Sequence, residues 1–283
     1  MRKRLALHFL MLMLLPAALP AMHFGDLYVI PVAGHVRGAH GSLWQTDVAV
    51  HNFQSTTLTV ELAVAESGEA AADNFSPVSI SGSTTITIPA GGSRILRDVL
   101  ANHRGQIDTI GALIVGADAP FAVTSRTYNV AAAGVMTAGF SVPPIQEFLS
   151  TPSAMAFVPG LISNVTFRTN IGITAAAGAA APLVVEVSLL NAAGGMLGSR
   201  TFTVPAGAIN HIQLGSGAFS AAAYDEATAA VRIVSGSGDV VAYGSVIENS
   251  TNHAVFVSGI VPTPASAEST ESVFASLFQH IHR

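Results

Sequence analysis

The chain has 283 residues and a formal net charge of −5 at pH 7, and it is 50% hydrophobic and only 10% charged. Nucleic-acid binding requires clustered Lys and Arg, so this charge balance excludes that class of partner. The chain contains no cysteine, which excludes disulfides and thiol chemistry. Each folding unit must therefore be held together by its hydrophobic core.

The N-terminal residues have the three-part pattern of a secretion signal. Basic residues at positions 2–4 precede an apolar run, and a segment rich in Pro and Ala ends at Ala21. We predict a Sec-type signal peptide over residues 1–21, and hence a secreted or periplasmic bacterial protein. A retained membrane anchor is the alternative, but the apolar run is short and Pro16 breaks it. No later stretch approaches the ~20 apolar residues of a spanning helix.

Alternation of apolar and polar residues, which is typical of strands, begins at Trp44. From Trp44 to His51 the sequence WQTDVAVH places Trp, Thr and two Val on one face, and Gln, Asp, Ala and His on the other. Similar runs rich in Val, Ile, Thr and Phe are separated by Gly, Pro, Asn and Ser. They predict strands at 57–65, 84–88, 110–115, 121–128, 135–142, 167–174, 183–190, 200–204, 229–234, 240–247 and 254–261.

The strand pattern occurs twice along the chain. Three blocks recur in the same order: those around Trp44 and Phe167, Pro-Ala-Gly at 89–91 and 205–207, and the eight residues at 122–129 and 242–249. Matched blocks in one order indicate two copies of one folding unit. Short strands with regular turn signals favour antiparallel sandwiches. We therefore predict an all-β fold of two tandem antiparallel β-sandwich domains, at residues 22–148 and 149–262.

Two segments account for the difference in spacing between the copies. Residues 66–82 are polar and contain Gly and Pro, which predicts a long loop or a hairpin extension in the first copy. Residues 216–228 are an insertion in the second copy, where a short helical turn fits the sequence. Residues 263–283 are predicted to form a flexible linker and a short C-terminal amphipathic helix. That helix either docks on its own sandwich or attaches the protein to a partner or membrane surface.

The first copy carries the most specific sequence block. The segment IPVAGHVRGAHGSLWQTDVAVHN at residues 30–52, with the later PAGGS and SRTYN blocks, resembles uncharacterised secreted bacterial proteins built from tandem β-sandwich (Ig-like) repeats. The resemblance covers nearly all of the chain after residue 21. The second copy departs from it, because Phe167 replaces the Trp and Asn170 replaces the Asp. The resemblance implies fold and export, and it implies no chemistry.

Candidate site residues gather in the first copy, at His35, His40, Asp47 and His51. Imidazole and carboxylate are common zinc ligands, so a metal site is one interpretation. However, Asp47 and His51 are four residues apart on one strand, which places them about 13 Å apart at ~3.3 Å per residue. That distance is too long for a shared ion. We therefore predict no metal and keep these four residues as interaction candidates.

Asp47 and Asn170 occupy equivalent positions in the two copies. A catalytic Asp47 is one hypothesis, but recurrence favours a short polar side chain that satisfies backbone groups at a sheet edge or turn. Trp44 is predicted to be a core residue, not a sugar platform, because Phe167 replaces it on the apolar face. The sequence contains no Gly-x-Ser-x-Gly, no phosphate-binding Gly-rich loop and no His-Glu-x-x-His. We predict no enzyme, no catalytic residue and no cofactor.

Two classes of function remain. The first is an exported, non-catalytic structural or interaction protein of the bacterial cell envelope or exterior, with a protein or cell-surface partner. Its contacts are expected at the Gly-rich segment 34–41 and the loop 66–82. The alternative is a carbohydrate- or metal-binding accessory module.

Overall fold

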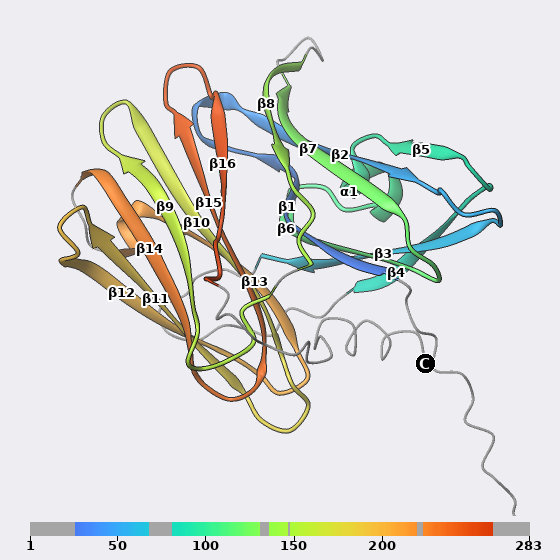
Figure 1. The fold of residues 1–283 in the computed structure, drawn as a ribbon. Coiled ribbons are helices and arrows are strands. Elements are labelled where there is room, and N and C mark those ends of the chain that lie inside the picture. Colours follow the sequence, from blue (N-terminus) through green and yellow to red (C-terminus); the bar gives the residue numbers. More distant parts are fainter. Residues whose placement is uncertain (1–25, 68–80, 131–135, 147, 220–222, 263–283) are drawn as a thin grey trace, which may run out of the picture.

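The computed structural model of the chain describes residues 26–67, 81–130, 136–146, 148–219 and 223–262. The fold is all-β, and all pairs of named strands are antiparallel (Figure 1). The predicted signal peptide and C-terminal helix lie outside the described residues, as does most of the predicted loop at 66–82.

The N-terminal half is one continuous eight-stranded sheet that curls around a core (Figure 1). The strand order is β4-β3-β6-β1-β2-β7-β8, with β5 paired to β2. A short helix, α1 (Val99–Arg104), and a 3-10 turn, η1 (Ala39–Gly41), connect strands. The strands are β1 (Asp26–Arg37), β2 (Leu43–His51), β3 (Leu58–Glu66), β4 (Ser81–Ile88), β5 (Ser93–Leu96), β6 (Thr109–Ala117), β7 (Ala122–Val130) and β8 (Met136–Val142).

The C-terminal half contains two four-stranded sheets, β12-β11-β14-β9 and β13-β10-β15-β16, which share one core. A 3-10 turn, η2 (Ser216–Phe219), begins the predicted insertion. The strands are β9 (Met155–Ser163), β10 (Phe167–Ala177), β11 (Leu183–Asn191), β12 (Met196–Val204), β13 (Ile209–Gly215), β14 (Tyr224–Ser235), β15 (Gly238–Glu248) and β16 (Ala254–Ser258).

Every strand pairing of the C-terminal half has a counterpart in the N-terminal half, eight strands earlier. The N-terminal half has one additional pairing, between the end of β1 and the start of β2, where Val36 faces Trp44. Strand β1 has 12 residues whereas β9 has 9, so β1 is long enough to reach the second layer. This extension joins the two layers into a single curled sheet, which differs from the two separate sheets expected of a sandwich.

Each strand predicted from alternation overlaps a strand of the structure, but β1, β5, β9 and β13 were not predicted. Proline explains the omission of β1 and β9, because Pro31 and Pro159 lie within them. The pairing register shifts at both places, between Ile30 and Ala33 in β1 and opposite Pro159 in β9. A bulge of this kind accommodates a residue that lacks the N–H needed by a regular ladder.

The two halves pack directly against each other. One apolar cluster combines Leu27 and Ala63 of the N-terminal half with Ile209 and Val241 of the C-terminal half. The segment that joins the two halves also contributes, because Leu149 is fully buried and its backbone pairs with that of Val240. The halves therefore share a buried apolar contact and are not connected by a free tether.

A row of aromatic rings crosses this interface. Its successive members are His211, Tyr243, Phe256, Phe140 and Trp44, with ring centroids 6.0, 5.4, 6.3 and 5.9 Å apart. Tyr243 is fully buried and belongs to the core cluster of the N-terminal half, although its strand is β15. Stacked and tilted aromatic pairs contribute beyond their buried area, so this row stabilises the contact between halves.

Candidate functional site

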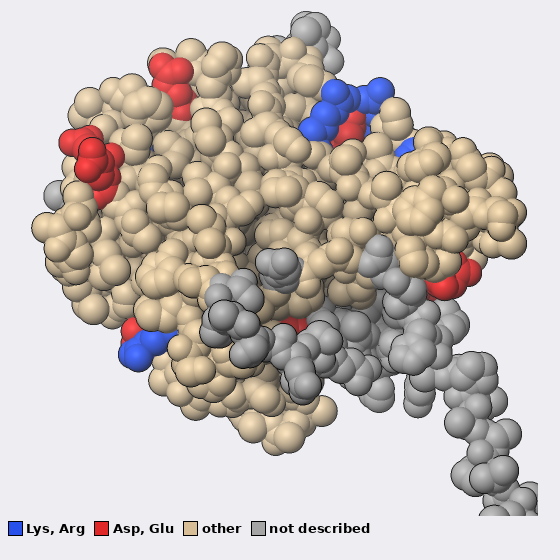
Figure 2. All heavy atoms as spheres, in the orientation of Figure 1, with Lys and Arg blue, Asp and Glu red and all other residues tan. Residues whose placement is uncertain are grey.

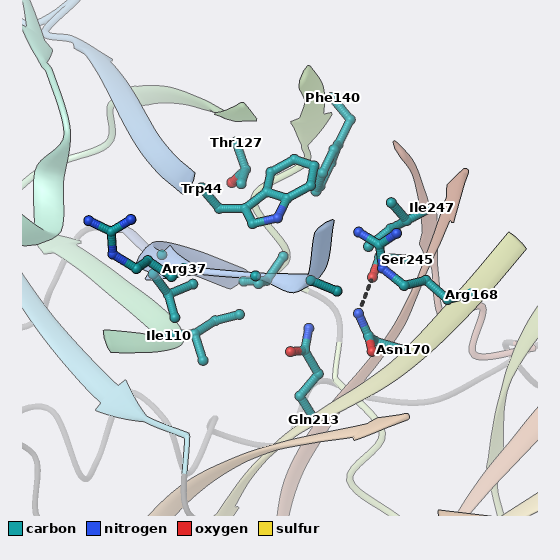
Figure 3. Close-up of a pocket in the computed structure, with 15 residues that line it drawn as sticks. Arg37, Trp44, Ile110, Thr127, Phe140, Arg168, Asn170, Gln213, Ser245 and Ile247 are labelled. Carbon is teal, nitrogen blue, oxygen red and sulfur yellow. Dashed lines mark hydrogen bonds between the residues drawn. The ribbon is translucent and has the colours of Figure 1, made fainter. Parts of the chain in front are cut away.

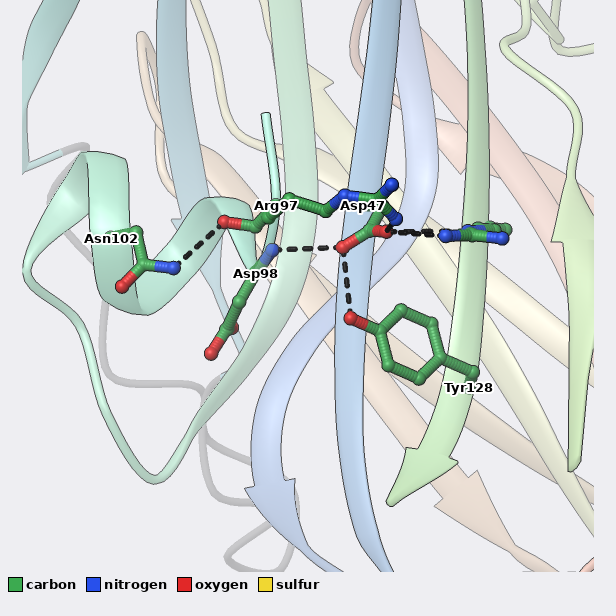
Figure 4. Close-up of polar contacts among 6 residues, drawn as sticks. Asp47, Arg97, Asp98, Asn102 and Tyr128 are labelled. Atoms are coloured by element: carbon green, nitrogen blue, oxygen red, sulfur yellow. Dashed lines mark hydrogen bonds and ion pairs between the residues drawn. The ribbon is translucent and has the colours of Figure 1, made fainter. Parts of the chain in front are cut away.

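Asp47 lies at the centre of a polar cluster on strand β2 (Figure 4). Its carboxylate accepts hydrogen bonds from Arg97 Nη1 at 2.7 Å, Arg126 Nη2 at 2.8 Å, the Tyr128 hydroxyl at 2.9 Å and the backbone N–H of Asp98 at 2.9 Å. Alternation along β2 predicted that Asp47 points outward on a solvated face. The structure differs, because these partners cover the carboxylate and leave the side chain 3% exposed.

Electrostatics keep the carboxylate of Asp47 charged. Burial by itself raises the pKa of Asp47, but hydrogen bonds from Arg126, Asp98, Arg97 and Tyr128 outweigh burial and hold that pKa below its usual value. Burial and the adjacent carboxylate raise the pKa of Tyr128 to about 12, so its hydroxyl remains a donor. A carboxylate satisfied by four donors acts as a structural anchor, but three of these donors are side chains and only the N–H of Asp98 is a backbone group.

Asp47 does not sit at a sheet edge or turn, which is where the structural interpretation of this position placed it. Strand β2 is flanked by β5 and β7, so the cluster fixes the middle of the sheet. The segment after β5 is held by the same cluster, since the backbone of Asp98 adopts a left-handed conformation with φ 45° and donates to Asp47.

The predicted histidines are dispersed around this cluster. His35 Nδ1 lies 2.8 Å from Asp98 Oδ2, so His35 reaches Asp47 only through Asp98. His40 is exposed in η1, with φ 56°, and His51 is exposed with Nδ1 2.9 Å from Ser93 Oγ. Within the described ranges no group of three or more His, Asp or Glu side chains is arranged to hold a metal ion. The four interaction candidates therefore do not form one site.

The equivalent face of the C-terminal half carries no such cluster. Asn170 stands in place of Asp47, and it pairs with Ser245 where Asp47 pairs with Arg126. Sequence blocks had aligned Ser125 with Ser245, but the ladders place Arg126 opposite that position, one residue along. A shift of one residue moves a side chain to the other face of a sheet. Ser245 is therefore the counterpart of Arg126, and it lies on the same face as Asn170.

A cavity of about 290 Å³ lies where this face meets the N-terminal half (Figure 3). We call it the junction cavity. The N-terminal half contributes β1, β2, β6, β7 and β8, and the C-terminal half contributes β10, β13 and β15. Its lining residues are Val32, Gly34, Val36, Arg37, Gly38, Ala39, Trp44, Ile110, Thr127, Phe140, Arg168, Asn170, Gln213, Ser245 and Ile247.

The junction cavity combines apolar walls with a few polar side chains, which is the usual composition of a ligand site. Trp44 is 8% exposed, which confirms that it is buried, and its ring also forms part of the cavity wall. Five residues of the Gly-rich segment 34–41 line the cavity: Gly34, Val36, Arg37, Gly38 and Ala39. A Cβ at Gly38 would lie 2.9 Å from Trp44 Nε1, so this glycine lets the backbone approach the indole.

Surface charge is sparse around these features. Figure 2 shows a mostly uncharged face, with basic side chains gathered over β2 and β7. Among the residues that the structure describes, no helix is both long and apolar enough to cross a membrane. No protein-family model matches the chain, and no curated protein matches it.

Sequence reasoning missed the residues that complete both sites. Arg97 and Arg126 contact Asp47 from 50 and 79 residues away, and Arg168, Gln213 and Ser245 come from three strands. One signal in the sequence pointed to both sites. Asp47 and Asn170 are equivalent positions, and this position is charged in the first copy and neutral in the second.

Proposed function

We propose that this protein is an exported, non-catalytic interaction protein of the bacterial cell envelope or exterior, and that it binds its partner in the junction cavity. The observation that carries the proposal is the cavity itself, which both halves build. Its side chains are apolar groups, amides, hydroxyls and guanidinium groups, and these groups bind and orient ligands. Export rests on the N-terminal signal pattern.

The repeated unit supports this location. We propose that the halves are two copies of one sandwich unit and that they diverged at the Asp47 position. In the first copy, two Arg side chains and a Tyr fill the face around Asp47. In the second copy, the neutral pair Asn170 and Ser245 stands in place of the charged pair Asp47 and Arg126, and the first copy lies over this face.

Carbohydrate binding is the second candidate, and one observation favours it. The ring of Trp44 forms a wall of the cavity that also contains the amides of Asn170 and Gln213 (Figure 3). Indole and amide groups in one cavity are suited to sugar rings, which present both C–H groups and hydroxyls. An accessory module of this kind would use the same cavity.

Blocking the cavity tests the proposal. Ala39 is exposed at the cavity wall, so Ala39→Trp obstructs the cavity without disturbing a core. Ala90 is exposed in the turn before β5 and is not part of the lining, so Ala90→Trp is the matched control. Each protein is cross-linked in cell-envelope extract, its captured partners are identified by mass spectrometry, and its binding to a glycan array is measured.

We expect the wild type and Ala90→Trp to capture the same partner and Ala39→Trp to lose it. Capture that is equal in all three proteins would contradict a role for the cavity in binding that partner, and capture that is absent from all three would contradict a macromolecular partner. A glycan signal that only Ala39→Trp loses would favour the carbohydrate alternative.

A further inference from the structure

One end of the junction cavity gathers hydrogen-bond donors from three adjacent strands. Arg168 and Asn170 are two residues apart on β10, so they share a face of the sheet. Ser245 is opposite Asn170 on β15, and Gln213 approaches from β13. Figure 3 shows these four side chains together on one side of the cavity, with Arg37 at the opposite side.

Arg168 retains unused donors at this end. Its Nη1 and Nη2 donate to Asn249 Oδ1 at 3.2 Å and Asn252 Oδ1 at 2.8 Å, and these bonds use two of its five N–H groups. Both partners are neutral amides, and burial lowers the pKa of Arg168. An added anion stabilises a partly desolvated cation with neutral partners more than it stabilises a cation that water already solvates.

Trp44 adds a donor from the N-terminal half. Its side chain is more than nine-tenths buried, and its indole N–H has no hydrogen-bond partner among the described residues. Figure 3 shows the indole nitrogen on the edge of the ring that faces Asn170 and Gln213. The ring lines the cavity, so its indole N–H is placed to donate to a ligand that supplies an acceptor there.

The charge and shape of the cavity restrict that ligand further. Two Arg and no Asp or Glu occur among the described lining residues, which gives the cavity a positive potential. Guanidinium and indole groups only donate, so they match an anionic acceptor such as a carboxylate. The remaining wall is apolar, with Val32, Ile110 and Phe140 among its residues.

We propose that the junction cavity binds a small organic monocarboxylate, with its carboxylate at Arg168 and its apolar body against Trp44 and Phe140. The cavity of about 290 Å³ equals the volume of about ten water molecules in the liquid, so it accommodates a body the size of one aromatic ring or a short branched chain. This inference rests on the proposed function, because it names the chemistry of the partner at the same site.

The test compares an acid with its neutral isostere. Phenylacetate and phenylacetamide have nearly the same shape and differ in charge. Binding of each to the purified protein is followed by calorimetry and by the fluorescence of Trp44, which is the only tryptophan in the chain. The variants are Arg168→Gln, Arg168→Lys and the control Arg232→Gln, whose guanidinium is exposed on β14.

We expect phenylacetate to bind about tenfold or more tightly than phenylacetamide, because charge-assisted hydrogen bonds contribute about 1.5–3 kcal/mol. Arg168→Gln should abolish this preference and leave the affinity for phenylacetamide nearly unchanged. Arg168→Lys should retain most of the preference, and Arg232→Gln should behave as the wild type.

Three results would overturn the inference: equal affinity for acid and amide in the wild type, an unchanged preference in Arg168→Gln, or loss of the preference in Arg168→Lys. The inference would also be overturned if neither phenylacetate nor short branched aliphatic acids bound. Binding only of peptides with a free C-terminal carboxylate would overturn it as well. Capture of a partner that Ala39→Trp abolishes would then still support the proposed function, so the two failures are distinguishable.

Discussion

Acid should destabilise this protein through His211. This residue is fully buried on β13, and its Nε2 lies 3.0 Å from the hydroxyl of Tyr243. Burial lowers the pKa of His211 from 6.5 to about 3, because the interior cannot solvate an imidazolium ion. The unfolded chain binds a proton near pH 6.5, whereas the folded chain binds none at this site until the pH is far lower.

Proton linkage gives the direction and the size of the change in the free energy of unfolding with pH. Between the two pKa values the unfolded state binds one more proton than the folded state, so the free energy of unfolding decreases as the pH falls. The contribution of His211 is fully present above pH 6.5 and is lost at about 1.4 kcal/mol per pH unit below it. From pH 6.5 to 4.5 this single site should remove about 3 kcal/mol, a large part of a typical domain's stability.

The assay is urea unfolding of the wild type and His211→Gln at four pH values between 7.5 and 4.5. Glutamine retains a hydrogen-bonding group for Tyr243 but does not titrate. The variant should be less stable at pH 7.5, by roughly 1–2 kcal/mol for lost packing. Its stability should, however, decline less steeply with acid, by about 1.4 kcal/mol per pH unit. The control is His253→Gln, because His253 is exposed. If His211→Gln and the wild type had the same slope, the assignment to His211 would be refuted.

Two further substitutions test the packing and the polar cluster. Gly172→Ala places a Cβ 1.9 Å from ring atoms of Tyr243 and should lower the free energy of unfolding by about 2–3 kcal/mol, whereas Gly215→Ala, with nothing within 4 Å, should change it little. Asp47→Asn should cost about 2–3 kcal/mol in chemical denaturation at pH 7, because two guanidinium groups lose their shared counter-charge. Glu186→Gln breaks an exposed ion pair and should cost much less, and a comparable loss in both would contradict the anchoring role of Asp47.

Local pattern was sufficient to predict the all-β class and the positions of most strands, because alternation reports directly which face of a strand is buried. It failed at β1 and β9, where Pro31 and Pro159 suggest a break but a bulge lets the strand continue. It also failed at Asp47, since the alternation of β2 carries no information about Arg97 and Arg126, which cover that face from distant segments.

The candidate site was less predictable than the fold. The junction cavity depends on how two halves dock, and periodicity within one strand does not encode docking. The repeat did indicate that the Asp47 and Asn170 positions differ in charge. Only the strand ladders, however, showed that Ser245 is opposite Asn170 and that the sequence blocks are offset by one residue.

Tyr243 has a consequence for how the chain loses its structure. Its backbone is part of β15, while its side chain completes the core of the other half. Unfolding of the C-terminal half would remove the Tyr243 ring from the core of the N-terminal half and leave a cavity there. Unfolding of the N-terminal half would expose the same ring to solvent. We therefore expect the stability of each half to depend on the other, even though the sequence repeats one folding unit twice. Either half expressed alone should be less stable than it is within the whole chain, because it would lack these contacts.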